Sequence, residues 1–357
     1  MNTLSNNSMN ADSATTEFPL REAQALVRPL MTPNPWIYWT DFLFHVGLGW
    51  FTFFYIVSHW QLTPWTALAY IVATLCVYRA GIFVHELAHL KKGTFRLFRV
   101  VWNLICGIPL LIPSFTYDGV HNHHHKRDAY GTAEDGEYLH FTGQRPIYMV
   151  GYVLLSFILP WLAVIRFLVL TPLGWLIPPL GRLIWARASS LTIDAAYNRP
   201  ANAIRNDTYW RLEEAGAFLF AAVVAWGFVS GVLPLRALAL WYAITTLVFI
   251  LNSLRTLAAH AYRNDPSHHL SVVEQYLDSI NVPGNPLLTP LWAPVGLRMH
   301  ATHHLFPAMP YHNLLKAHRL LVDQLSDNTL YVSTLRSSLW DALRKIWGEA
   351  AANTRGK

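Results

Sequence analysis

The sequence predicts an all-α integral membrane protein with about four transmembrane helices in two hairpins, further interfacial helices, and a cytosolic helical cap that carries a two-metal site. Three observations lead to this prediction. Of the 357 residues, 53% are hydrophobic and 13% are charged, and this charged share is about half that of a typical soluble domain. Apolar runs long enough to span a membrane occur in closely spaced pairs. Seventeen histidines are present, and many of them gather in three short clusters.

Two pairs of apolar runs predict the two hairpins. The first pair covers about 41–58 and 65–84, and the second covers about 214–233 and 235–254. Each run has roughly 18–20 residues, the length at which a helix crosses about 30 Å of hydrocarbon. Because only a short connection separates the members of a pair, we expect each pair to cross the membrane and return.

Two further apolar stretches are interrupted by prolines and glycines. They cover about 100–115 and 148–185. If all the histidine clusters meet on one membrane face, an even number of crossings must separate them. The first stretch is therefore expected to lie in the interface or to dip in and return. The second should cross twice or not at all, since its breaks favour a bent or re-entrant path.

The distribution of basic residues predicts the orientation. The 58–64 loop has no Lys or Arg and the 233–236 loop has only Arg236, whereas the opposite ends of the helices carry most of the others. The positive-inside rule then places the histidines on the cytoplasmic face. The net charge of +6 is not concentrated in a Lys/Arg-rich block, so nucleic acid is not an expected partner.

Three regions are expected along the chain. Residues 1–35 lack the apolar core of a signal peptide and predict a flexible polar tail. Residues 36–320 form the membrane domain, and 321–357 form a cytosolic helical extension. The only two cysteines, Cys76 and Cys106, lie inside apolar runs, which excludes a disulfide framework or a cysteine-based zinc site.

The histidine clusters have the spacing of metal ligands on helices. They read HELAH at 85–89, HNHHH at 121–125 and HATHH at 300–304. Residues at i, i+3 and i+4 share a helix face, so their imidazoles can converge, whereas His123 points away. The eight candidates exceed the three or four ligands that one zinc needs, and imidazole alone does not name the metal. These candidates are His85, His89, His121, His124, His125, His300, His303 and His304.

The ordered boxes, together with Leu305-Phe306-Pro307 and Pro310-Tyr311-His312-Asn313-Leu314, resemble the membrane fatty acid desaturase and hydroxylase superfamily over about 40–320. The resemblance is closest to bacterial acyl-chain desaturases. It implies two Fe ions, O2 as co-substrate, and a ninth ligand after the last span, for which His260 is the candidate. It also implies O2-dependent insertion of a carbon–carbon double bond into an acyl chain.

The same resemblance implies the partners. The substrate is expected to be a long-chain acyl lipid, acyl-CoA or acyl-carrier protein, bound in an apolar slot lined from the 36–84 hairpin and the 214–254 pair. The sequence has no fused haem motif, nicotinamide or flavin fingerprint, or iron–sulfur cysteines. A separate ferredoxin, or cytochrome b5 with its reductase, is therefore the implied electron donor.

Several residues are candidates for orienting or assisting the ligands. Carboxylates flank the second box and can accept the second imidazole N–H. Thr256 stands where stearoyl-type members of the family carry an asparagine that holds a metal through water. His312 resembles a family position outside the ligand set. The flanking carboxylates are Asp118, Asp128, Glu134 and Asp135.

Other functions remain open at this point. Hydroxylation, acetylenation, epoxidation and carotenoid-type oxygenation use the same boxes. HELAH also fits a membrane zinc metalloprotease with Glu86 as the general base, although that function leaves six box histidines unused. A non-enzymatic metal transporter would carry its histidines within the spans, whereas these lie at the predicted cytosolic ends.

Overall fold

The computed structural model describes residues 18–90, 93–141, 144–200 and 208–355, and within these ranges the chain is helical with no named strand. The predicted all-α class is therefore confirmed. Two helices of the first hairpin, α2 (Pro35–Ser58) and α3 (Pro64–His89), pack along one another. Gly49 permits this approach, because a Cβ atom there would lie 3.0 Å from Cγ2 of Val77.

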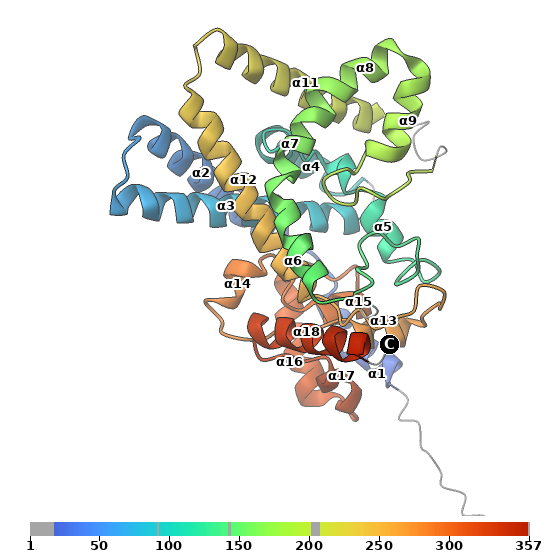
Figure 1. The fold of residues 1–357 in the computed structure, drawn as a ribbon. Coiled ribbons are helices and arrows are strands. Elements are labelled where there is room, and N and C mark those ends of the chain that lie inside the picture. The colour runs from blue at the N-terminus through green and yellow to red at the C-terminus, as the bar shows by residue number, and fades with distance from the viewer. Residues whose placement is uncertain (1–17, 91–92, 142–143, 201–207, 356–357) are drawn as a thin grey trace, which may run out of the picture.

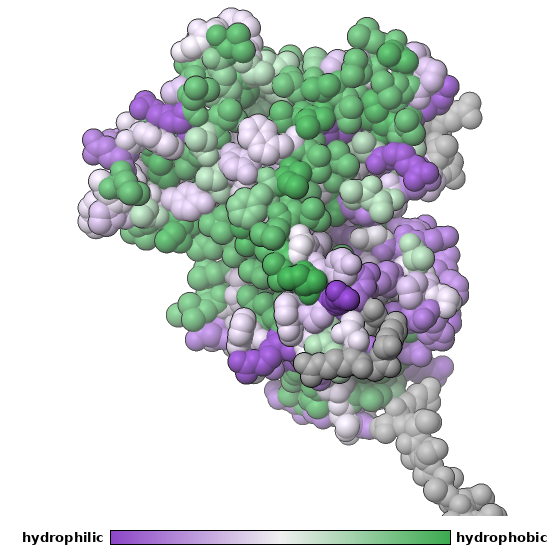
Figure 2. All heavy atoms as spheres, in the orientation of Figure 1, coloured by the Kyte–Doolittle hydropathy of each residue, from purple (hydrophilic) through white to green (hydrophobic). Residues whose placement is uncertain are grey.

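The second pair of long helices is less tightly associated. Helices α11 (Thr208–Val229) and α12 (Leu235–Leu257) diverge from their connecting turn (Figure 1). Helix α12 packs instead on α3 and on the helical run that begins with α6 (Ile147–Leu154). All four long helices are long and apolar enough to cross a membrane, and hydrophobic residues dominate their visible surface (Figure 2).

The 100–115 stretch doubles back, which is the course predicted for it. Helix α4 (Arg96–Trp102) continues as a π-helical turn, Asn103–Gly107. The side-chain oxygen of Asn103 accepts a hydrogen bond of 2.8 Å from the backbone N–H of Ser114, so the two ends of the stretch meet. Its tip reaches into the membrane helices, where the Trp50 indole of α2 donates to the carbonyl of Ile105.

The 148–185 stretch contains a fifth helix that the sequence analysis did not count. After α6, the segments α7 (Leu159–Val164), Ile165–Leu170 and α8 (Thr171–Leu176) make 18 residues long and apolar enough to span. Its prolines do not break it, because each lies in the first turn of its own segment, where a missing N–H costs little.

The fifth helix is followed by a return. Helix α9 (Pro178–Ala188) folds back along α8, and Gly181 makes this possible, since a Cβ there would lie 2.3 Å from the carbonyl oxygen of Gly174. Before the turn, Met149 packs in one cluster with Tyr130. After it, Arg199 donates to the carbonyl of Phe115. Both ends thus lie beside the second histidine box, in agreement with an even number of crossings.

The remaining helices form a cap beneath the membrane helices (Figure 1). Their shared core includes Met299, Leu314, Leu321 and Tyr331. The cap contains α13 (Val272–Asp278), α14 (Thr289–Trp292), α15 (His300–Leu305), α16 (Tyr311–Gln324), α17 (Thr329–Ser333) and α18 (Leu339–Arg355). Helix α16 runs through the boundary predicted at 320/321, so this boundary does not separate two cores.

The predicted flexible N-terminal tail contains helical residues. Residues 1–17 lie outside the described part of the chain. Beyond them, α1 (Leu20–Val27) and the short helix Arg28–Leu30 pack against α16, with Ala23 and Val27 buried. A prediction of flexibility up to residue 35 was wrong for this part, because its apolar positions repeat with helical spacing and have a partner surface in the cap.

The orientation of the chain can be tested with single cysteines. In a background without Cys76 and Cys106, which are both buried, Ser58→Cys and Ser267→Cys each place one thiol at an exposed position. We expect a membrane-impermeant thiol reagent to label position 58 in spheroplasts and position 267 only after lysis, because the positive-inside rule puts the cap in the cytoplasm. Labelling of position 267 before lysis would contradict this topology.

Candidate metal centre

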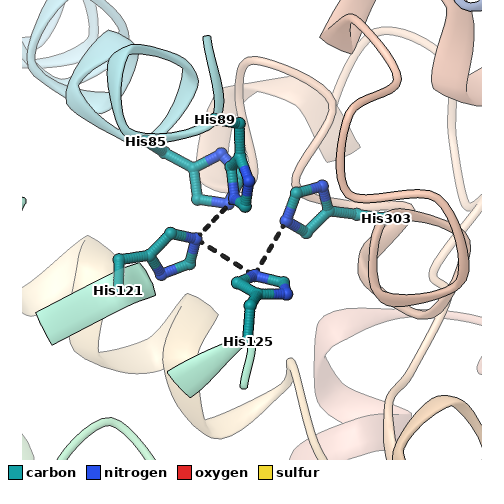
Figure 3. A group of neighbouring side chains, drawn as sticks. All are labelled: His85, His89, His121, His125 and His303. Atoms are coloured by element: carbon teal, nitrogen blue, oxygen red, sulfur yellow. Dashed lines mark hydrogen bonds between the residues drawn. The ribbon is translucent and has the colours of Figure 1, made fainter. Parts of the chain in front are cut away.

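The nine predicted histidine ligands all lie together, although they come from four separate segments. Five of them form one group, with their closest ring nitrogens all within 4.8 Å of one another (Figure 3); the other four form a second group by the same criterion. The five-histidine group consists of His85, His89, His121, His125 and His303. The four-histidine group consists of His124, His260, His300 and His304.

Helix phase determines how the boxes divide between the groups. His85 and His89 lie one turn apart at the end of α3 and both join the five-histidine group. The second box, on α5 (Val120–His124), sends His121 and His125 to that group and His124 to the other. The third box, on α15, is divided in the opposite sense, with His303 in the five-histidine group and both His300 and His304 in the other. Each HxxHH box therefore contributes to both groups and ties them into one centre.

Hydrogen bonds fix the tautomers of several of these rings. The Nδ1 atom of His121 lies 2.6 Å from a carboxylate oxygen of Glu137, and that of His124 lies 2.8 Å from Asp135. An ionised carboxylate only accepts, so Nδ1 carries the proton and Nε2 presents a lone pair. The carboxylates therefore aim the Nε2 atoms of both rings at the centre of their groups.

The Nε2 atoms lie close enough together to share a cation. In the five-histidine group, Nε2 of His121 lies 2.7 Å from Nε2 of His89 and 3.1 Å from Nε2 of His125. Lone pairs that face one another repel, and one neutral ring cannot donate through both nitrogens. Both ring nitrogens of the buried His85 also have no hydrogen-bond partner among the described residues. The residues thus fit a metal ion in each group.

Burial keeps most of these rings in the neutral form that binds metals. It lowers the pKa of His125, His303 and His304 well below the ordinary value, and the neighbouring imidazoles lower it further. His124 differs. Burial opposes its protonation, but the charge and hydrogen bond of Asp135 outweigh that effect and raise its pKa. Such a carboxylate partner makes an imidazole a more basic ligand.

Four predicted assisting residues do not contact the nine histidines. Asp118 pairs with Arg99 at 2.9 Å, and Thr256 accepts a hydrogen bond from Arg255. His312 accepts from the backbone N–H of Asn34. Asp128 is exposed in a shallow surface pocket.

The residues that do orient the rings include two that the sequence analysis missed. Besides Asp135, which was among the flanking carboxylates considered, they are Glu137 and Tyr130; the Tyr130 hydroxyl lies 2.8 Å from Nδ1 of His260. The chain returns to the second box through a turn at Gly131, where φ is +70°. Proximity along the chain therefore pointed to Asp135 correctly but missed Glu137.

A cavity of about 420 Å³ opens onto the centre. His85, His121, His124, His260 and His300 form part of its wall. Much of the remainder is apolar and comes from α3, α7 and α12, including Ile82, Leu159, Leu162, Val248 and Phe249. In the described part of the chain, neither α2 nor α11 contributes a residue to the wall. Of the two predicted hairpins, only one helix each, α3 and α12, therefore lines the cavity.

Comparison with known proteins agrees with this arrangement. The family model described as fatty acid desaturase matches residues 58–336. The chain is also similar to a protein named ceramide hydroxylase from Caulobacter vibrioides (strain NA1000 / CB15N), with 38% identity over 327 residues, which is 92% of each chain.

We expect His124→Ala to lose most of its bound metal and at least about 100-fold in activity, while His123→Ala keeps both. The two residues are adjacent, but His124 belongs to the four-histidine group, whereas the His123 ring lies 6.4 Å from that of Tyr197, away from both groups. Metal analysis and product yield measure the effect. Equal losses in the two variants would contradict the division made by helix phase.

Glu137→Gln is expected to weaken metal binding about 10–100-fold, because an amide holds the proton of His121 less firmly than a carboxylate. Asp128→Asn serves as the matched control, since Asp128 flanks the same box but is exposed. Metal retention during titration with a chelator provides the measurement. If the two variants release the metal alike, Glu137 does not orient the ring.

Proposed function

This chain belongs to the fatty acid desaturase family, and from that premise we propose that it is a membrane di-iron, O2-dependent lipid hydroxylase acting on a ceramide-like substrate. One observation carries the proposal: five histidines from the two groups form part of the wall of a largely apolar cavity. The similarity to a ceramide hydroxylase over 92% of the chain supports hydroxylation and this substrate class.

We propose iron as the metal and the nine histidines as its ligands. Nine imidazoles exceed what one zinc needs and leave both groups rich in nitrogen ligands. This excess disfavours a zinc protease based on His85 and His89, because both belong to a group of five histidines. When bound, a pair of irons reduces O2 and supplies an oxidant able to remove hydrogen from an unactivated methylene.

The protein supplies orientation and exclusion of water. Glu137, Asp135 and Tyr130 hold the Nδ1 sides of three rings, so that the Nε2 sides stay directed into the groups. Leu155, Leu159 and Leu162, among the apolar residues of the cavity wall, can hold an extended alkyl chain beside the histidines. A chain bound there displaces water from the reacting carbon, which suppresses side reactions.

The proposed reaction consumes two electrons. A C–H bond, O2, two electrons and two protons give a C–OH bond and one water. We propose that the electrons come from a separate ferredoxin, or from cytochrome b5 with its reductase. The proposed location is the inner membrane, with the centre accessible to such donors from the cytoplasm.

Desaturation is the second candidate, and the match to the fatty acid desaturase model favours it. There the same O2, electrons and protons remove two hydrogens from adjacent carbons and give a C=C bond with two waters. The ligand set is the same for both reactions, so the histidines do not discriminate between them.

Product mass discriminates directly. The chain is expressed with a ferredoxin and reductase in a bacterial host supplied with N-palmitoylsphinganine, and the lipids are analysed by mass spectrometry. We expect a gain of one oxygen in the ceramide, absent in the His124→Ala variant. A loss of two hydrogens instead would establish desaturation, and oxidation of only the host's phospholipid or free acyl chains would overturn the ceramide assignment.

A further inference from the structure

An arginine lies in the cavity wall close to the histidine groups. Arg255 belongs to the last turn of α12 and lines the same cavity as His260 and His300. Its Nε and Nη2 atoms donate to the side-chain oxygen of Asn252 at 3.2 and 3.1 Å. Nη2 also donates to the hydroxyl of Thr256 at 2.9 Å. These partners are neutral, so they fix the position of the guanidinium without balancing its charge.

In the described ranges, no carboxylate oxygen lies within 4.0 Å of the Arg255 guanidinium. By contrast, Arg79 pairs with Asp41, Arg99 with Asp118 and Arg166 with Glu214. A charge in apolar surroundings without a partner is costly, and in a membrane segment it usually marks a functional site.

The lining of the cavity indicates what the guanidinium meets. Along α12, the lining changes from the apolar Val248 and Phe249 to the polar Asn252, Ser253 and Arg255, which lie nearer the histidines. An alkyl chain matches the apolar part, whereas the polar part offers hydrogen-bond donors to an oxygen. An acyl chain attached to a bulky carrier would keep its polar head outside and would need no cation within. The arrangement instead suits a lipid whose own polar end enters the cavity.

We propose that Arg255, held by Asn252, binds the amide carbonyl and hydroxyl oxygens of an N-acyl amino alcohol and so positions its polar end beside the metal centre. The inference rests on the proposed lipid oxygenase function and specifies its substrate and regiochemistry. Arg255 and His260 both line the cavity, one before and one after the end of α12 at Leu257. The oxidised carbon is therefore expected near the polar end of the substrate rather than in the middle of its alkyl chain.

Binding tests the inference independently of turnover. Tritium-labelled N-palmitoylsphinganine is titrated into purified protein in detergent micelles. We expect Arg255→Met to raise Kd at least about tenfold, because a hydrogen bond to a charged group is lost, while Arg255→Lys stays within about threefold of the parent. Arg236→Met is the matched control, since Arg236 lies exposed at the other end of the same helix, and its Kd should not change.

Iron content and gel-filtration profile are measured for each variant, so that weak binding caused by misfolding is recognised. Equal Kd values for Arg255→Met and the parent would overturn the inference, whether or not the lipid is oxidised. A second measurement needs no variant: fragmentation mass spectrometry locates the oxidised carbon in the product of the unaltered protein. Oxidation in the middle of the alkyl chain, far from any nitrogen or oxygen, would also overturn it, while leaving the oxygenase function intact.

Discussion

The convergence of neutral imidazole lone pairs is the constraint on which the rest of the structure depends. Nine rings from α3, α5, α15 and the segment after α12 must meet with their ligand atoms within 4.8 Å in each group. A cation binds the lone pairs that face it, so the rings must be held with those lone pairs directed inward. Partners of the Nδ1 atoms, such as Glu137 and Asp135, hold them in this way.

The membrane helices meet this constraint by doubling back. Two segments, around 100–115 and 147–188, enter the apolar region and return, and each leaves irregular backbone there. Such backbone needs hydrogen-bond donors where water is scarce. Indole N–H groups provide two of them in the first segment: Trp50 donates to Ile105 and Trp241 to Pro109, each to a backbone carbonyl. The aromatic content of the sequence thus contributes to the fold as well as to anchoring at the interface.

The sequence could predict the two groups of histidines because most of their members lie in boxes of five residues. Helix geometry converts the spacing of His300, His303 and His304 into a shared face. Of the partners of the rings, Asp135 was among the predicted candidates, but Glu137 was not. Glu137 follows its ligand by sixteen residues, and only a folded turn brings it back, whereas the nearer Asp118 is taken by Arg99.

The same distinction explains the errors in the fold. Prolines in the 148–185 stretch predicted breaks, but Pro160 and Pro172 each fall in a first helical turn, where the structure tolerates them. The N-terminal tail was called flexible because α1 has no apolar run of its own; its buried residues are stabilised by α16, almost 300 residues later in the chain. Both errors arise where contacts with distant segments, rather than local residue spacing, determine the structure.

In this centre, the arrangement of the histidines does not determine how the substrate is positioned. Hydroxylation and desaturation place the same demands on the histidines, so the choice between them depends on which carbon is held near the centre and for how long. That choice belongs to the cavity wall, where the apolar residues of α7 and α12 meet the guanidinium of Arg255. An alkyl chain alone can slide along an apolar wall, because dispersion contacts have little directionality. A fixed polar contact at one end removes this freedom, so a single cation can set which carbon faces the metals without altering any of their ligands.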